Sequence, residues 1–599
     1  MSSKKKSLDS WIEKYNYSKS KFQSNLDRYE RENEIYEGKA GALDVTTRGR
    51  KSKVDAKCFR NIVFELIETQ INNAIPFPKV IPVDADNVDL ALNIEGYLKL
   101  QSDRIRAEDI NDTAERGILK HGAGYYHVMW DEKITTPITR GDLVVKYYPI
   151  DKVFPQPGNT ELEDCEWIIV EDLVSIKKLK QLYGVTVPED PEYREKAKLY
   201  TAWYFNDKNN VCRFGWVEDV VVFDQPDYYV RKLKVCKDCD THILHHKSCP
   251  TCDNDKFVYR PIETEIMEED IIEIDIETQE ERLLVRAGDE VPYYNIDQLP
   301  FVLRRNISKE KSLYGLSDIT ILEQNQDSLN KIMTKMEENV LKAGSFLTKP
   351  KGVNLPLTDE TLKVVTVNDP RQADAFRVHT VQANMQQDNI LQDSLYKFAR
   401  EMMGITDSYQ GKRDPTAESG KAKEISAAQA SGRMESKRRM KDSAYAKLYQ
   451  LMFKFLLAYC DEPRTFSRIT PEGEYIDARF SRYNFINIDD EGKPYYTDRF
   501  FFSVDSASIL STSREAMWQE TTRNLQIGTF GNPQDPMSLK LYWSVMKGLG
   551  YPLASQALAS LHERAQQLPM ELQQAIMQNP EVLNSVRDQL AGGDENETG

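Results

Sequence analysis

Residues 316–343, LSDITILEQNQDSLNKIMTKMEENVLKA, predict a long helix with a single apolar seam. The apolar positions step by seven, four, three, four and three residues, and they are Leu322, Leu329, Met333, Met336, Val340 and Ala343. This spacing is typical of coiled coils, whose seam is buried against a second helix. We therefore expect an oligomer seam, in which the facing helix can be the same helix of the next subunit, formed by Leu322, Leu329, Met333, Met336 and Val340.

Downstream of this helix the pattern breaks and then becomes helical again. Prolines interrupt residues 345–382, which we expect to form a loop region with short strands. Helices are predicted over 386–403 and 420–460, and the first half of the second is rich in lysine and arginine. Such a face is usually exposed to solvent, although it could also meet phosphate or a neighbouring subunit. The rest is expected to comprise short strands to residue 504, helices over 514–527 and 537–590, and a disordered tail over 591–599.

Upstream of the seam helix, helical and strand patterns alternate. The first forty residues and residues 59–71 carry apolar positions at helical spacing, and a further helix is expected over 94–121. Gly122 and Gly124 then lead into an aromatic and β-branched run typical of a strand. Further strands are predicted over 143–148, 167–170, 200–205, 211–223 and 269–276. The expected fold class is α+β, with long helices and a mixed β region.

Charge is unevenly distributed along the chain. The formal net charge is −16, and residues 263–290 contain twelve acidic residues against Arg282 and Arg286. Because affinity for phosphate comes mainly from lysine and arginine, this balance counts against a surface that wraps nucleic acid. An acidic wall can instead let a DNA duplex slide without sticking.

The sharpest chemical motif is Cys236-Lys-Asp-Cys239, followed after nine residues by Cys249-Pro-Thr-Cys252. Each CxxC turn can present two thiolates, and four thiolates in a tetrahedron are a ligand set that zinc prefers. We expect Cys236, Cys239, Cys249 and Cys252 to hold one structural Zn2+ per chain, with the three histidines of the intervening loop as bystanders. Such a closed shell leaves no position for a reactive water, so the zinc would stabilise the fold without catalysing hydrolysis. The alternative is four unligated thiols.

Several protein classes do not fit the sequence. No apolar run approaches the roughly 20 residues that cross a bilayer, and the N-terminus lacks the apolar core of a signal peptide. The remaining cysteines are isolated, which is unlike a disulfide scaffold and favours a reducing compartment. Residues 415–422 lack two residues that a phosphate-binding loop requires, and no nucleophile or metallohydrolase motif occurs. We therefore expect neither an enzyme nor a membrane protein.

Four stretches of the chain resemble portal proteins, the head-to-tail connectors of tailed bacteriophages. They are residues 27–38, beginning Asp27-Arg-Tyr-Glu; residues 117–131, GILKHGAGYYHVMWD; residues 148–155, YPIDKVFP; and residues 300–330, which include Leu313-Tyr-Gly-Leu-Ser-Asp318. In portals a Gly-x-Ser motif, here Gly315-Leu-Ser317, opens a stem helix that packs against its copies around a ring. The zinc motif departs from the general portal pattern.

The resemblance implies an elongated subunit built from wing, clip, stem and crown. It divides the chain into N-terminal helices and an α/β wing (1–225), an acidic wing and clip region with the zinc knuckle (226–300), a stem helix (301–345), a tunnel-loop region (346–385), a long wing helix with a β segment (386–535), crown helices (536–590) and a disordered tail (591–599).

The resemblance also implies the function. Portals form a ring, here expected to be a dodecamer, at a capsid vertex of the virion, and the ring assembles in the host cytoplasm. Double-stranded DNA passes through the channel during packaging and ejection, with Lys349 and Lys351 as candidate phosphate contacts. The implied protein partners are terminase, the head-tail adaptor, and capsid and scaffold proteins.

Two other classes stay open on the residues alone. One is a zinc-ribbon DNA-binding or adaptor protein, in which Lys232, Lys234, Lys247 and Lys256 beside the cysteines would touch DNA. The other is a metal-dependent enzyme, which would require an open coordination position that the four cysteines do not leave.

Overall fold

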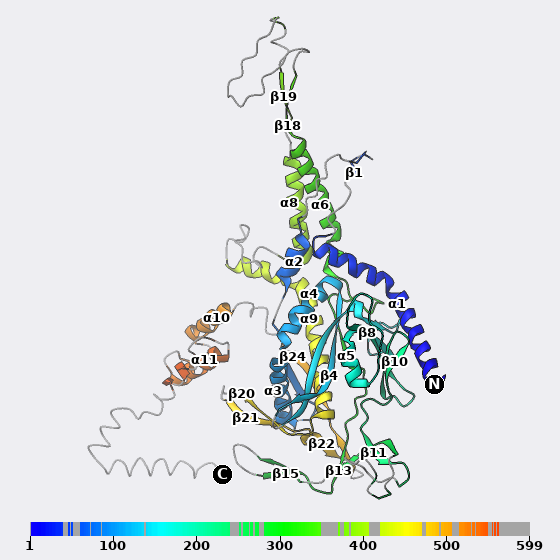
Figure 1. The fold of residues 1–599 in the computed structure, drawn as a ribbon. Helices are drawn as coiled ribbons and strands as arrows, with labels where there is room; N and C mark the ends of the chain where they lie inside the picture. Colours follow the sequence, from blue (N-terminus) through cyan, green and yellow to red (C-terminus); the bar gives the residue numbers. More distant parts are fainter. Residues whose placement is uncertain are drawn as a thin grey trace, which may run out of the picture. The chain divides into compact units, whose positions relative to one another are not determined.

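The structure of the chain is a computed structural model, and Figure 1 shows its ribbon coloured along the sequence. It describes residues 2–39, 46–47, 50–51, 60–71, 74–84, 87–136, 139–239, 249, 251–252, 256–262, 264–267, 270–274, 281–348, 369, 371, 377–381, 385–405, 420–469, 475–489, 493–505, 514–528, 530–532, 535–548, 551, 554, 556–558 and 560–561. Two compact units are present, one comprising Met1–Arg464 with Arg479–Asp505 and the other Thr465–Ala478 with Ser506–Gly599.

The first unit opens with a long helix laid on an antiparallel sheet. On one face of the sheet, Trp11 of helix α1 (Ser2–Tyr36) packs against Ala202 and Phe214. On the other face, Leu199 and Val217 pack in a core with helix α5 (Ile176–Tyr183). Period-two alternation thus gives the sheet two buried faces. The strands lie in the order β10-β9-β8-β7-β6, with bounds β6 (Val153–Pro155), β7 (Trp167–Ser175), β8 (Lys196–Phe205), β9 (Val211–Val217) and β10 (Val220–Gln225).

A second, three-stranded sheet has the order β17-β4-β5, with β4 (Ala123–Thr135), β5 (Arg140–Pro149) and β17 (Phe301–Arg305). It is preceded by two helices, α3 (Val88–Arg104) and α4 (Ala107–His121), and not by the single helix expected over 94–121. The helix is interrupted because Arg106 takes a left-handed φ of 51°. At Gly122, where φ is 82°, a Cβ would lie 2.5 Å from the carbonyl oxygen of Gly315, so this turn requires glycine.

The predicted seam helix is present as α6 (Asp318–Lys342). Its N-cap is Ser317, whose hydroxyl accepts a hydrogen bond from the Thr320 N–H. Helix α8 (Gln386–Met403) lies beside α6 (Figure 1), and the antiparallel strands β18 (Gly344–Thr348) and β19 (Arg377–Val381) adjoin the two helices. We call helices α6 and α8 together the α6–α8 hairpin. Helix α2 (Ile62–Gln70) packs against both of its helices.

Helix α9 (Gly420–Tyr459), the longest in the described part of the chain, contacts β17 and β4 and also covers the pair of β3 (Phe77–Pro82) and β24 (Phe500–Asp505). Its C-terminal half is apolar and buried, and Phe453 packs its ring on Phe485, Phe500 and Phe502. This packing fixes the helix on the two sheets.

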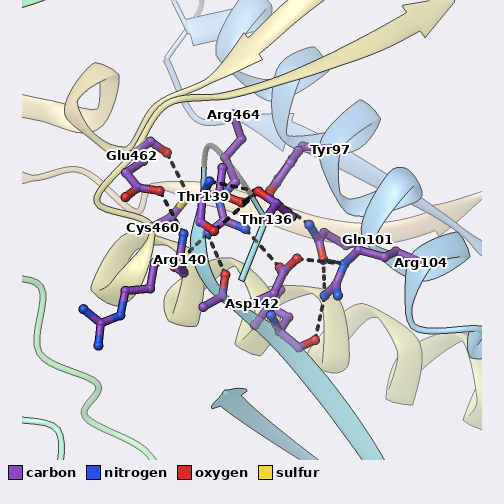
Figure 2. Close-up of polar contacts among 12 residues, drawn as sticks. Tyr97, Gln101, Arg104, Thr136, Thr139, Arg140, Asp142, Cys460, Glu462 and Arg464 are labelled. Atoms are coloured by element: carbon purple, nitrogen blue, oxygen red, sulfur yellow. Dashed lines mark hydrogen bonds and ion pairs between the residues drawn. The ribbon is translucent and has the colours of Figure 1, made fainter. Parts of the chain in front are cut away.

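Figure 2 shows a polar lock near the end of α9. The Arg464 guanidinium donates to the carbonyl oxygen of Gly141 at 2.8 Å and lies 3.2 Å from Asp142 Oδ1, while Arg104 Nε on α3 lies 3.0 Å from Asp142 Oδ2. The side chains of Arg464 and Asp142 are nearly buried. Separating a buried carboxylate from its guanidinium partners is costly. The ion pairs of Asp142 with Arg104 and Arg464 therefore connect α3 and β5 to the chain that follows α9.

The remaining strands pair two by two. They are β1 (Thr46–Thr47) with β2 (Arg50–Lys51), β11 (Lys232–Cys236) with β12 (Phe257–Pro261), β13 (Thr264–Ile266) with β16 (Glu290–Pro292), β14 (Ile271–Ile274) with β15 (Glu281–Val285), β20 (Arg464–Ile469) with β21 (Tyr475–Phe480), and β22 (Ile486–Ile488) with β23 (Pro494–Tyr496). The α+β class expected from the sequence is confirmed by this combination of long helices and separate sheets.

The second unit contains helices α10 (Arg514–Ile527) and α11 (Pro536–Gly548), which enclose a small core around Tyr542, Met546 and Ala554. Residues 562–590 of the expected crown helices and the expected tail 591–599 lie outside the described residues. Among the helices that the structure describes, none is both long and apolar enough to cross a membrane.

Candidate functional site

The four predicted zinc ligands come together at one end of the β11–β12 pair. Cys236 ends β11 opposite Phe257, and the Sγ atoms of Cys236 and Cys252 are 3.3 Å apart. Cys239 Sγ lies 3.4 Å from the Sγ atoms of both Cys249 and Cys252. All four ligand atoms lie within 4.8 Å of one another. A tetrahedral zinc–thiolate site, with Zn–S bonds of about 2.3 Å, needs sulfur atoms roughly 3.8 Å apart, so the donor set fits this ion.

The thiol of Cys249 has a lowered pKa. Burial raises its pKa, but hydrogen bonds from the backbone N–H groups of Thr251 and Cys252, and from the thiols of Cys239 and Cys252, lower it to about 6. A thiolate, and not a thiol, is the form that binds a metal. Cys236 and Cys249 are buried whereas Cys239 and Cys252 are exposed, so the site stands at the surface with two ligands turned inward.

The other described cysteines are structural. Cys165, Cys212 and Cys460 are buried, and burial raises the pKa of each thiol, to about 12 for Cys460. Cys58 and the three loop histidines lie outside the described residues. Among the described residues, no second group of three or more Cys, His, Asp or Glu side chains is arranged to hold a metal.

The second candidate site, the apolar seam of α6, is divided between two environments. Leu322 and Leu329 are fully buried in their own chain, where they share a core with α2 and α8, and Met333 packs at its edge. Met336 is half-buried and Val340 is 50% exposed. The chain itself therefore fills the first half of the seam, and the half nearer β18 is more exposed.

The α6–α8 hairpin also has an apolar face that the sequence analysis missed. Ile390, Leu391 and Phe398 on α8 are 61, 49 and 54% exposed, whereas Ala399 and Met403 on the opposite face are buried. Helical spacing could have revealed this second stripe, but it cannot tell which of two apolar faces is covered.

The start of α6 is anchored by buried charges. Asp318, fully buried, accepts hydrogen bonds from Lys437 Nζ on α9 at 2.7 Å and from Asn306 Nδ2 at 2.8 Å. Glu32 on α1 accepts from the hydroxyls of Ser317 and, at 3.0 Å, Thr320. Helices α1, α6 and α9 therefore meet at the beginning of the hairpin.

The basic half of α9 is only partly a solvated face. Lys441 Nζ lies 2.6 Å from Glu115 Oε1, and Arg304 holds the other oxygen of that buried carboxylate at 2.8 Å. Burial raises the pKa of Glu115, but the charges of Arg304 and Lys441 outweigh this and lower it below its usual value. The solvated-face interpretation is thus wrong for Lys437 and Lys441, because both are paired with carboxylates of other elements. The side chains of residues 420–433, and the candidate DNA contacts Lys349 and Lys351, lie outside the described residues.

Comparisons with known proteins agree with the resemblance seen in the sequence. A family model described as phage P22-like portal protein matches residues 59–593. The match includes the cysteine cluster, the α6–α8 hairpin and three of the four stretches that carried the resemblance, while residues 27–38 precede it. A comparison with curated proteins finds no match. Because the family model covers most of the sequence, this chain belongs to the family of phage P22-like portal proteins.

Proposed function

We propose that this chain assembles into a ring of about a dozen subunits, placed at a capsid vertex of the virion, through which double-stranded DNA is packaged and ejected. The observation that carries the proposal is the family match over residues 59–593. Portals are structural proteins, and the ring would bind terminase, which supplies the ATPase, as well as head-tail adaptor, capsid and scaffold proteins. The chain itself would catalyse no reaction.

The α6–α8 hairpin supplies a contact between subunits. Exposed apolar residues on one helix face are typical of contact sites, and α8 presents Ile390, Leu391 and Phe398 in this way. In a closed ring, each subunit uses two different surfaces, one for each neighbour. We propose that these residues pack on Met336 and Val340 of the adjacent α6.

The pairing of α6 with α8 refines the proposed division of the chain. Residues 386–403 contact α6, so we place them in the stem with residues 301–345 and take them out of the wing segment. Residues 346–385 then connect the two stem helices. The assignment of a tunnel-loop region to residues 346–385 stays a prediction.

The acidity of the chain suits a conduit. A net charge of −16 repels the DNA backbone, so a duplex can move along the channel without being held by many phosphate contacts. The four-cysteine cluster would bind one Zn2+ per chain and stabilise the β11–β12 pair.

The proposal is tested by electron microscopy of the purified full-length protein. Rings of about a dozen subunits with a central hole are expected, and a stable monomer at all concentrations would contradict the proposal. Phe398→Asp should abolish rings at concentrations where the wild type forms them, because it places a charge in the contact. Asn389→Asp changes an exposed residue of the same helix that lies on the side opposite Phe398, so it adds the same charge outside the apolar stripe and should leave the rings intact.

The rival function is direct DNA binding by the zinc hairpin. It predicts a salt-sensitive affinity for duplex DNA that disappears in Cys236→Ser while the wild-type protein stays monomeric.

A further inference from the structure

The β11–β12 hairpin has little apolar core of its own. Its buried side chains are Val235, Cys236 and Cys249, with Phe257 adjoining, whereas Val258 and Tyr259 are 40 and 65% exposed. An isolated two-stranded hairpin is marginally stable in water at best. A bound zinc ion would hold the cysteine end together, but Val258 and Tyr259 farther along the strand would stay exposed.

This hairpin is also a basic segment in an acidic chain. Residues 231–260 contain seven Lys and Arg against four Asp and Glu, although the whole chain has a net charge of −16. Lys234 lies opposite Tyr259 in the strand register, and Lys232 shares its face because side chains alternate along a strand. Lys237 follows directly after β11 and is exposed. Lys232, Lys234 and the exposed ring of Tyr259 therefore share one face.

The next segment of the chain has the opposite character. The pairs β13–β16 and β14–β15 lie at the same end of the first unit as β11 (Figure 1), and we call them the acidic hairpins. Residues 263–290 contain twelve acidic residues and two arginines. Val285 and Val291 are buried against Tyr483, while Ile266 and Leu283 are 63 and 41% exposed. Like the basic hairpin, this surface presents apolar side chains among charges, but the charges have the opposite sign.

We propose that the β11–β12 hairpin of one subunit docks on the acidic hairpins of the next copy. The proposal rests on the proposed ring, in which each interface joins two different surfaces of the same chain. Opposite charges orient such a contact, and like charges placed opposite each other are strongly unfavourable. The exposed apolar residues of both surfaces would supply the buried area.

Charge reversal in the full-length protein tests the contact. A basic-surface variant, Lys232→Glu with Lys237→Glu, places negative charge opposite the acidic hairpins. An acidic-surface variant, Glu265→Lys with Glu290→Lys, places positive charge opposite the basic hairpin. All four residues are exposed. Each variant alone should need at least about tenfold more protein to form rings than the wild type, as measured by sedimentation velocity.

Mixing the two variants gives the decisive result. In a one-to-one mixture, every interface of an alternating ring joins opposite charges again, so rings should return near the wild-type concentration. The matched control is Lys177→Glu with Lys178→Glu on α5, two exposed lysines with the same change in net charge, which should assemble like the wild type. Zinc content and helical circular dichroism verify that each variant is folded.

Three outcomes overturn the docking proposal. They are normal rings from either variant alone, no rescue by mixing, or normal rings in the basic-surface variant combined with loss of a salt-sensitive affinity for duplex DNA. The last would assign the hairpin to nucleic acid. A wild-type protein that forms no ring contradicts the proposed function itself, and so the two failures are distinguishable.

Discussion

Lys437 Nζ lies 2.7 Å from both carboxylate oxygens of Asp318, so the long helix α9 is joined to the first residue of α6 across 119 positions of sequence. Asp318 is fully buried and Lys437 is only slightly exposed. The pair therefore combines the interaction of two opposite charges with that of a carboxylate and the positive end of a helix.

Lys437→Met is expected to lower the free energy of unfolding by about 3 kcal/mol, because it leaves the carboxylate of Asp318 buried without its cation. Chemical denaturation followed by circular dichroism measures this change. The matched control is Lys447→Met on the same helix, where the ion pair with Glu163 is exposed and the cost should be below about 1 kcal/mol. Equal effects in the two variants would show that the buried pair has no special role.

The two halves of the α6 seam should respond differently to truncation. Leu322→Ala removes a fully buried side chain and should destabilise the subunit by about 2–5 kcal/mol. Val340→Ala, at a half-exposed position, should change subunit stability by less than about 0.5 kcal/mol but weaken ring assembly. Thermal unfolding and sedimentation velocity measure the two properties separately. A Val340→Ala variant that assembles normally would remove this residue from the subunit contact.

Stability should fall in mild acid because of His127. Burial, and to a lesser extent the charges of Arg213 and Lys146, lower the pKa of His127 well below 6.5, and neither ring nitrogen has a hydrogen-bond partner. Between the lowered pKa and 6.5 the unfolded chain binds a proton that the folded chain does not. The free energy of unfolding therefore decreases as pH falls through this window, by at most about 1.4 kcal/mol per pH unit for this one group.

His127→Phe tests this assignment. Phenylalanine can keep the stack on Phe301, whose ring centroid is 4.4 Å away, and it removes the titrating group and two unpaired buried nitrogens. The variant should lose stability less steeply between pH 7 and pH 5, and at pH 7 it should be at least as stable as the wild type. Urea unfolding at a series of pH values gives both quantities. An unchanged slope would assign the acid sensitivity to other groups.

Removal of zinc should affect the knuckle and not the rest of the fold. The purified protein is expected to contain one zinc per chain, and Cys249→Ser should lose it because a tetrahedral site then lacks one thiolate. Cys165→Ala, which changes a buried cysteine outside the cluster, should retain the metal. Elemental analysis measures the zinc, and faster proteolysis between residues 237 and 256 would report the opened knuckle. A zinc-free wild type that resists proteolysis there would contradict the structural role.

Local patterns predicted the helices well. Helices α8 and α10 begin and end at the predicted residues, and α6 spans 318–342 where 316–343 was expected. These boundaries follow from the spacing of apolar residues and from a cap such as Ser317, all within a few residues of chain. The break at Arg106 was missed because its left-handed backbone conformation has no glycine or asparagine to signal it.

The sequence by itself determined the helical seam, the four zinc-type ligands and the resemblance to portals, because periodicity and ligand spacing are local properties of the chain. Only the tertiary structure decided that Leu322 and Leu329 are covered by the same chain while Val340 is exposed. It also decided that Lys437 and Lys441 face buried carboxylates in place of solvent. Both results depend on contacts between elements that are far apart in the sequence. The packing and desolvation free energies that select these contacts are summed over the whole fold, so no single segment of sequence predicts them.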